Sequence, residues 1–224
     1  MIKFSYFGHS CFMIDNGITK LLFDPYFTGN PVATVKQEDV DCQYIFVSHA
    51  HGDHLGDAAL IAKRTGAMII GVPEVLRLCQ EQGCENVYGM NIGGSHRFPF
   101  GKVRMTTAIH SCGVAGGHAC GFVVHFDTIN IYFAGDTSLF SDMQIIGRKE
   151  NIDYAILPIG DEYTMGMEDA AMAAQLLNAR NVIPVHYNTW EKIAQNPEEY
   201  KQMTESMSRA EVHIVPLDGT LELK

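Results

Sequence analysis

The sequence predicts an α/β protein. Short apolar runs typical of strands alternate with stretches of helical periodicity, and no linker or low-complexity segment separates them. Each half of the chain opens with strand-like runs and continues as alternating strands and helices, an order that suits two sheets covered by helices. The 224 residues, of which 46% are hydrophobic and 19% charged, fit one domain over residues 1–224 with a substantial core.

The first half begins as a β-meander, because alternating apolar runs are joined by Gly8 and by a turn at residues 15–17. The three strands of this meander are predicted at residues 2–7, 11–15 and 19–23. The apolar run 44–47 predicts a buried strand. Periodicity then predicts four more elements: helix 55–64, strand 67–71, helix 73–82 and a short strand at 86–89.

The second half opens with three further predicted strands, at residues 102–109, 120–126 and 129–134. Asp127-Thr128 supplies the turn between the last two. Alternating periodicity predicts the remaining elements: helix 139–147, strand 153–157, helix 168–179, strand 181–185, helix 197–208 and strand 211–215.

A cluster of metal-ligand residue types follows strand 44–47. Residues 49–54 have the sequence His-Ala-His-Gly-Asp-His. In an extended segment His49 and His51 point to one side, because they are two residues apart. Asp53 and His54, at the start of the next helix, turn back from another direction. This division into two pairs indicates two adjacent metal ions, each needing further ligands.

Three further ligand types stand at the ends of other strand-like runs: His110, Asp136 and His186. If these strands share a sheet edge, all the ligands converge on one rim. A single His-x-His is weak support for a metal site, because hydrogen-bonded histidines are common. Together with three ligands at strand ends, it predicts a metal site. Imidazole and carboxylate ligands without thiolate suit Zn²⁺, and also Mn²⁺, Fe²⁺ or Ni²⁺.

The ordered set His49-x-His51-x-Asp53-His54, His110, Gly135-Asp136 and His186 resembles the motifs of the metallo-β-lactamase superfamily. The chain is most similar to the prokaryotic metal-dependent hydrolases related to ascorbate-6-phosphate lactonase, in segments at residues 8–12, 22–26, 133–137, 157–161, 164–166 and 183–189. The resemblance covers nearly the whole chain and implies a four-layer αββα sandwich.

The resemblance also implies a dinuclear centre. His49, His51 and His110 would hold one ion, while Asp53, His54 and His186 would hold the other and Asp136 would bridge the two. Two ions roughly 3.5–4 Å apart can share a hydroxide, because they lower the pKa of bound water to about 7. That hydroxide would attack a carbonyl or phosphorus, and Asp53 would guide it or relay a proton.

Several other residues are expected near this centre. His9 is either catalytic, as a substrate contact or extra ligand, or a packed histidine. Asp24, after a strand, is expected to orient a ligand histidine. The remaining candidates for the substrate pocket are Thr164, Met165, Gly166, Tyr187 and Asn188. The alternative for Met165 is packing in the core. For Tyr187 and Asn188, the alternative is a position without contact to the substrate. Cys112 is expected to border the metal site, where it either supports a ligand or packs, and does not bind the metal itself. His125 and His213 are expected to be ordinary strand residues.

The leading functional hypothesis is a dinuclear metal-dependent hydrolase of a small ester, lactone or phosphoester. A first alternative is a phosphodiesterase of a small or lipid-like diester, similar to N-acylphosphatidylethanolamine phospholipase D. A second is a metal-binding scaffold without turnover. Di-iron redox chemistry is disfavoured, because redox relatives usually carry Glu at the position of His51.

Composition narrows the classes of molecule that the protein is expected to bind. The net charge of −10 with only 16 basic residues disfavours nucleic acid, because phosphate neutralisation needs clustered Lys and Arg. No apolar stretch reaches the length of about 18 residues that predicts a spanning helix, and the N-terminus lacks the pattern of a signal peptide. The six cysteines form no Cys-x-x-Cys pair and are expected to be reduced. We therefore expect a cytoplasmic enzyme with a small-molecule substrate and no membrane partner; the resemblance suggests a homo-oligomer.

Overall fold

The computed structural model describes all 224 residues. Its contacts group the chain into two compact units, each containing one sheet and three α-helices. The first unit comprises residues 1–92, 111–119 and 215–224, and the second comprises residues 93–110 and 120–214. The prediction of a single domain over residues 1–224 stays a prediction.

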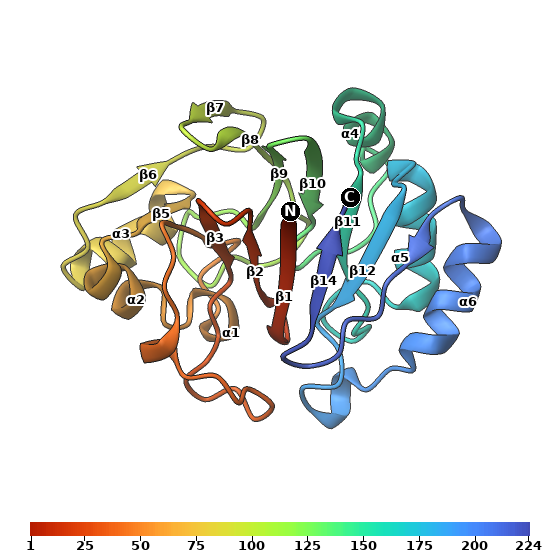
Figure 1. Cartoon of the computed structure of the whole chain (residues 1–224), viewed down its shortest axis with the longest axis horizontal. Coiled ribbons are helices and arrows are strands. Elements are labelled where there is room, and N and C mark those ends of the chain that lie inside the picture. The colour runs from red at the N-terminus through yellow and green to blue at the C-terminus, as the bar shows by residue number, and fades with distance from the viewer. The chain divides into compact units, whose positions relative to one another are not determined.

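The first unit is built on a seven-stranded sheet with the order β14-β1-β2-β3-β4-β5-β6. Neighbouring strands are antiparallel from β14 to β3 and parallel from β3 to β6. The strands are β1 (Ile2–Gly8), β2 (Cys11–Asp15), β3 (Lys20–Phe23), β4 (Tyr44–Phe46), β5 (Met68–Gly71), β6 (Val87–Gly89) and β14 (Thr220–Leu223). Helices α2 (Ala58–Thr65) and α3 (Pro73–Glu81) pack against its β5–β6 side (Figure 1).

A row of stacked phenylalanines holds the centre of this sheet together. Phe12 stacks on Phe4 and on Phe23, with ring centroids 5.1 and 4.5 Å apart, and Phe23 stacks on Phe46 at 4.6 Å. All four rings are fully buried and come from four consecutive strands. Such cross-strand aromatic pairs stabilise one register, because a shift by one residue would turn every ring to the other face.

The predicted helix 55–64 is wrong in one respect: the structure has two helices here, α1 (Gly52–Leu55) and α2. Gly56 separates them with a φ of 41°, and a Cβ atom at this position would lie 2.3 Å from the carbonyl oxygen of Pro25. The carboxylate of Asp57 accepts hydrogen bonds from the backbone N–H groups of Phe27 and Thr28. The helix therefore breaks because a neighbouring loop passes close to its backbone.

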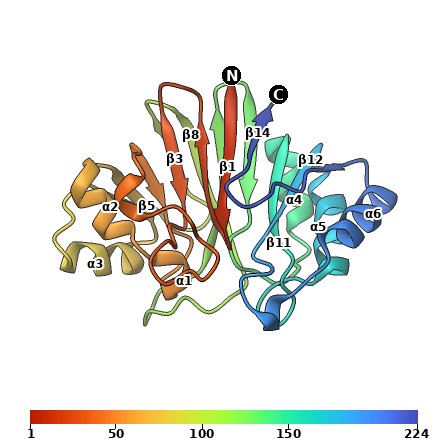
Figure 2. The ribbon, with the colours of Figure 1, turned by 60° about the horizontal axis from the view of Figure 1, so that its bottom comes forward.

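The second unit has a seven-stranded sheet with the order β13-β12-β11-β10-β9-β8-β7. Its strands are β7 (Ser95–Phe98), β8 (Gly101–Thr107), β9 (Cys120–Phe126), β10 (Ile129–Phe133), β11 (Tyr154–Pro158), β12 (Asn181–Val185) and β13 (Glu211–Val212). Pairs from β7 to β10 are antiparallel, and pairs from β10 to β13 are parallel. Helices α4 (Met143–Glu150), α5 (Met167–Leu177) and α6 (Pro197–Met207) pack in sequence beside the parallel strands (Figure 2).

The alanine-rich face of α5 forms the core of this unit together with residues of β11 and β12. Ala170, Ala171, Ala173 and Ala174 are fully buried against side chains that include Leu157 and Val182. The small side chains let the helix approach the sheet closely.

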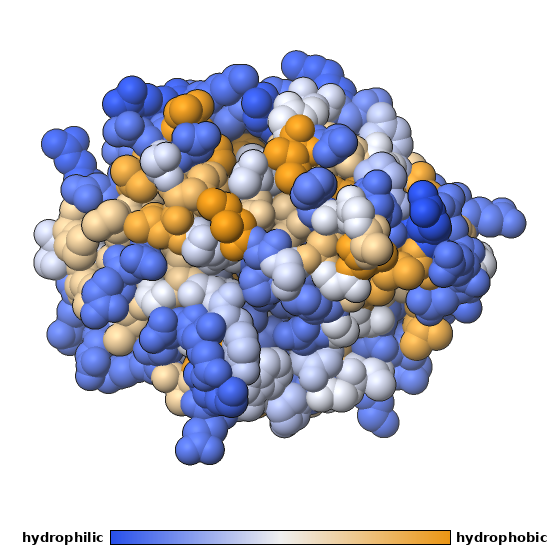
Figure 3. Space-filling view, turned by 180° about the vertical axis from the view of Figure 1, so that it is seen from behind, coloured by the Kyte–Doolittle hydropathy of each residue, from blue (hydrophilic) through white to orange (hydrophobic).

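On the exterior, hydrophobic and hydrophilic residues are interspersed on the face that Figure 3 shows. None of the helices is both long and apolar enough to cross a membrane.

Two strands escaped prediction. The strand β7 has the sequence Ser-His-Arg-Phe. Its polar residues suit a sheet edge, but they do not give the alternation of apolar and polar residues that predicts a strand. The strand β14 pairs with β1, more than 200 residues away in the sequence. Smaller differences affect the predicted helix 139–147, which lies at Met143–Glu150, and the predicted strand 211–215, which ends at Val212. Short 3-10 helices also occur at Gln37–Asp39 and Glu191–Ile193.

Candidate metal-binding residues

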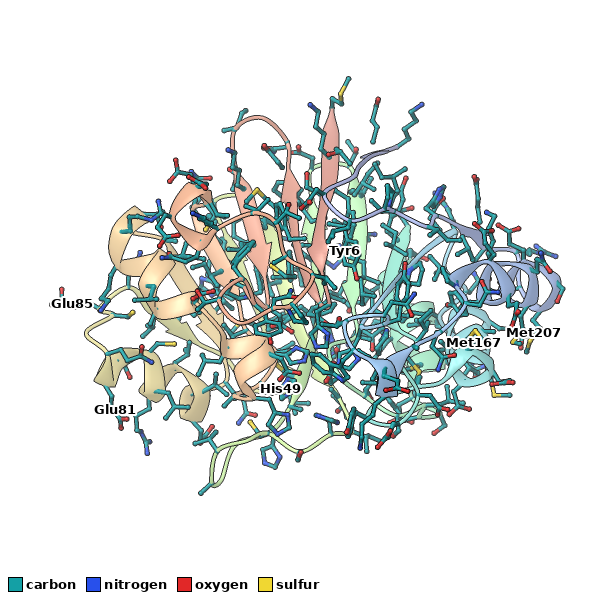
Figure 4. All side chains as sticks on the ribbon, turned by 90° about the horizontal axis from the view of Figure 1, so that it is seen from below. Tyr6, His49, Glu81, Glu85, Met167 and Met207 are labelled. Carbon is teal, nitrogen blue, oxygen red and sulfur yellow. The ribbon has the colours of Figure 1, made fainter.

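The first unit places its ligand-type residues just after strands. His9 follows β1, Asp24 follows β3, and the loop after β4 carries His49 and His51 into α1. Figure 4 shows His49 beside α1 at one end of these strands. Both His9 and Asp24 have a positive φ, of 56° and 38°. This left-handed conformation is uncommon for residues other than glycine and marks positions where the chain turns sharply to aim a side chain.

Imidazole and carboxylate groups meet in this loop. The ligand atoms of His9, Asp53 and His54 lie within 4.8 Å of one another. His9 Nε2 is 3.2 Å and His54 Nε2 is 3.8 Å from Asp53 Oδ2. His49 Nε2 lies 2.9 Å from His51 Nδ1. Imidazole nitrogens and carboxylate oxygens converging in this way form a donor set suited to Zn²⁺ and similar divalent cations.

A buried carboxylate orients two of these histidines. Asp24 is fully buried and accepts hydrogen bonds from Ser48 N (2.8 Å), Ser48 Oγ (2.6 Å) and His54 Nδ1 (2.7 Å). Since Ser48 donates its hydroxyl proton to Asp24, its oxygen accepts from Nδ1 of His49, 2.9 Å away. Both imidazoles then carry the Nε2 lone pair that a metal needs. Burial raises the pKa of the Asp24 carboxyl, and the charge and hydrogen bond of His54 oppose that rise.

The loop 111–119 encloses His51. Cys112 accepts a hydrogen bond of 2.7 Å from Ala50 N, and Ser111 Oγ lies 3.3 Å from His51 Nε2. Gly113 has a φ of 78°, and a Cβ atom there would lie 2.7 Å from Cδ2 of His51 and 3.0 Å from its backbone nitrogen. Only a glycine therefore fits against this imidazole.

The second unit gathers its own three ligand types. His110 follows β8, Asp136 follows β10, and His186 directly follows β12. Asp136 Oδ2 lies 3.2 Å from His186 Nε2 and 3.7 Å from His110 Nε2. His186 has a φ of 55°, and Gly160 packs so closely that a Cβ atom there would lie 2.4 Å from the His186 carbonyl oxygen. A carboxylate flanked by two imidazoles is again a donor set that fits a divalent cation.

Comparisons with known proteins identify the family. Residues 19–187 match the family model described as the beta-lactamase superfamily domain. This chain belongs to the metallo-β-lactamase superfamily. A relative from Heliobacterium modesticaldum, named "UPF0173 metal-dependent hydrolase", is 44% identical, and the alignment covers 100% of this chain and 98% of that protein.

Solved structures agree with this assignment to the superfamily. Igni18, described as a novel metallo hydrolase from the archaeon Ignicoccus hospitalis, superposes with a TM-score of 0.91 at 36% identity, covering 100% of this chain and 99% of that one. An isothiocyanate hydrolase from Delia radicum gut bacteria has a TM-score of 0.80 at 19% identity, with 98% of each chain covered, and shows the fold alone. The predicted α/β metallo-β-lactamase fold is thereby confirmed, with two mixed sheets flanked by helices.

The other predicted pocket residues of this superfamily member lie in the loops after β11 and β12. Met165 is fully buried in the hydrophobic core, which is the packing alternative. Its N–H binds the Thr137 carbonyl, and Thr164 N binds the Asp161 carbonyl. Gly166 precedes α5, Tyr187 packs half-buried on the same core, and Asn188 Oδ1 accepts from Gln195 N.

Several contacts were not predicted from the sequence: those of Ser48, Gly113 and Gly160, and also that of Tyr26, whose ring lies edge-on to His9 at 5.8 Å. Ser48 directly precedes His49, which is a signal that sequence analysis can use. The two glycines carry no such signal, because their importance depends on a backbone approach between distant segments. The predicted strand residues His125 and His213 do lie in or next to strands, and each contacts a polar side chain.

Proposed function

We propose that this protein, a metal-dependent hydrolase by family, binds two divalent cations and hydrolyses a small ester, lactone or phosphoester. The observation that supports this proposal is that each unit by itself brings imidazoles together around a carboxylate at the ends of its strands. By resemblance to the family motifs, His49, His51 and His110 would hold one ion. Asp53, His54 and His186 would hold the other, and Asp136 would serve as a ligand to both. Zn²⁺ is favoured, with Mn²⁺, Fe²⁺ and Ni²⁺ as alternatives.

When bound, such ions supply Lewis acidity and lower the pKa of a bound water to about 7. The chain's own residues then orient ligands and move protons. Asp24 and Ser48 hold the tautomers of His54 and His49. The carboxylate of Asp53 is 27% exposed, whereas its neighbour His9 is fully buried. Asp53 Oδ2 can therefore exchange a proton with solvent or a leaving group, while His9 keeps that carboxylate in place.

The proposed substrate is a small molecule. A net charge of −10 disfavours long polyanions such as nucleic acid. All six cysteines are buried and free, which supports a reducing compartment such as the cytoplasm.

Metal analysis of protein purified without added metal tests this function first. We expect about two ions per chain, and hydrolysis that is lost on chelation and restored by readdition of metal. A panel of lactones, simple esters and phosphodiesters would distinguish lactonase from phosphodiesterase action. Two ions with no turnover on any substrate would favour the scaffold alternative. A folded protein that takes up no metal on reconstitution would contradict the proposal.

A second prediction concerns the metal affinity and rests on the close contact between Gly113 and His51. Gly113→Ala should weaken metal binding roughly 10- to 100-fold, the range found when a group that orients a ligand is lost, because the new methyl displaces the His51 imidazole. The Co²⁺ absorption spectrum and competitive metal titration measure this effect.

Gly116 provides a matched control for this substitution. It lies in the same loop with nearly the same φ, 77°, but a Cβ atom at this position would have no neighbour within 4 Å. Gly116→Ala should therefore carry the same backbone strain and keep normal metal affinity. Equal losses for both variants would mean that strain in the loop, and not contact with His51, is responsible.

A further inference from the structure

Three basic residues stand side by side across three neighbouring strands of the second unit. Arg97 in β7 is directly paired with Lys102 in β8, and Lys102 is directly paired with His125 in β9. Directly opposed residues present their side chains on the same face, with Cβ atoms about 4.5–5.5 Å apart. Arg104, two residues after Lys102, lies on that face as well. Like charges opposed in this way repel one another, so the row needs compensation.

One buried carboxylate compensates only part of this row. Glu150, at the end of α4, is 4% exposed, and its Oε2 lies 2.9 Å from His125 Nε2. Its Oε1 lies 3.6 Å from Arg104 Nε. Neither Arg97 nor Lys102 has a carboxylate within ion-pair distance. These two side chains therefore stand side by side on neighbouring strands without an ion-paired carboxylate of their own.

The uncompensated cations border a cavity of about 590 Å³. Its lining includes Arg97, Lys102, His125, Phe98 and Phe100, with the exposed Asp127 as its one acidic residue. The rings of Phe98 and Phe100 are stacked, with centroids 5.3 Å apart and planes 3° from parallel. The volume falls in the range of roughly 300–1,000 Å³ found for small-molecule sites.

We propose that this cavity binds the phosphate group of a small molecule. The fork of an arginine matches phosphate oxygens in pairs, and a lysine adds a compact charge with three donors. A dianion between Arg97 and Lys102 would turn their repulsion into attraction. The half-buried ring of Phe100, stacked on the buried Phe98, offers an apolar flank for the rest of the ligand.

This site lies apart from the candidate ligands of the same unit. Lys102 stands near the start of β8, whereas His110 follows the end of that strand. The five residue-to-residue steps from Lys102 to Thr107 already span about 17 Å at about 3.3 Å per step. Strands β7 and β8 lie at one edge of the sheet (Figure 1). The proposal therefore does not depend on the proposed hydrolysis.

Thermal unfolding of the metal-loaded protein in increasing phosphate, at constant ionic strength, tests the proposal. The double variant Arg97→Gln/Lys102→Gln should lose at least 10-fold in phosphate affinity relative to the wild type. The matched control, Lys36→Gln/Arg77→Gln, removes the same charge from two exposed residues that have no carboxylate within ion-pair distance. It should respond to phosphate like the wild type. Phosphate bound by metal ions contributes equally to all three proteins and cancels in the comparison.

Phenylphosphonate, which cannot be hydrolysed as an ester, distinguishes free phosphate from a phosphate carried on an organic group. Tighter binding of phenylphosphonate than of inorganic phosphate, lost in the double variant, would indicate an organic ligand held by the phenylalanines. Equal affinities would indicate a site for the free anion. A phosphate response unchanged in Arg97→Gln/Lys102→Gln, or reduced equally in the control, would overturn the proposal.

Discussion

Replacing His51 with alanine is expected to reduce bound metal to one ion per chain or fewer and to lower the rate of hydrolysis more than about 100-fold. Removal of only the hydrogen-bond partner of a metal ligand already lowers activity by up to about 100-fold, and loss of the ligand itself should cost more. His51 Nδ1 lies 2.9 Å from His49 Nε2, so the variant loses one of two imidazoles that converge where the proposed ion would bind. Elemental analysis and the rate on the best substrate of the panel measure the two effects.

His118→Ala controls for the loss of an imidazole. His118 is exposed and lies in the loop 111–119 of the same unit. Its replacement should leave metal content and rate unchanged. A His51→Ala variant with normal metal and full activity would contradict the ligand assignment.

The second large effect is expected at Asp24. In Asp24→Asn an amide group must face one of the three donors that the carboxylate accepts, namely Ser48 N, Ser48 Oγ or His54 Nδ1. The tautomers of His49 and His54 are then no longer held. We expect metal affinity to fall about 10- to 100-fold, as for other partners of ligand histidines, with the fold retained. Competitive metal titration and circular dichroism measure the two properties.

Asp57→Asn separates this effect from a general loosening of the unit. Asp57 is also buried and accepts two backbone hydrogen bonds, from Phe27 and Thr28, but the structure gives it no contact with a candidate ligand. Its replacement should destabilise the loop while leaving metal affinity unchanged. A similar fall in affinity for both variants would show that Asp24 acts through stability alone.

The elements whose bounds agree best with the sequence-based prediction are those with a local sequence signal. Apolar periodicity predicted β2, β9 and β12 with their observed bounds, and it located the starts of α3 and α6 correctly. Local patterns suffice there because these strands are short apolar runs buried on both faces, and turn residues, glycine or proline lie near the ends of the elements. The order and spacing of the motif residues also predicted the superfamily, which the comparisons confirm.

Local patterns failed where distant segments meet. The break at Gly56 depends on the passage of Pro25, and the strand β14 exists because β1 offers an open edge at the other end of the chain. The polar strand β7 lacks an alternation of apolar residues. It is a strand because it pairs with β8, and its own sequence does not predict that pairing.

The same division applies to the candidate ligands. Residue types and their spacing in the chain already indicate imidazoles and carboxylates at strand ends, since chemistry and periodicity are properties of short segments. The tertiary structure alone shows that Asp24 reaches His54 across 30 residues, and that Gly113 closes on His51 across 62. Such contacts depend on how strands pair and how closely backbones approach, and no local pattern encodes them.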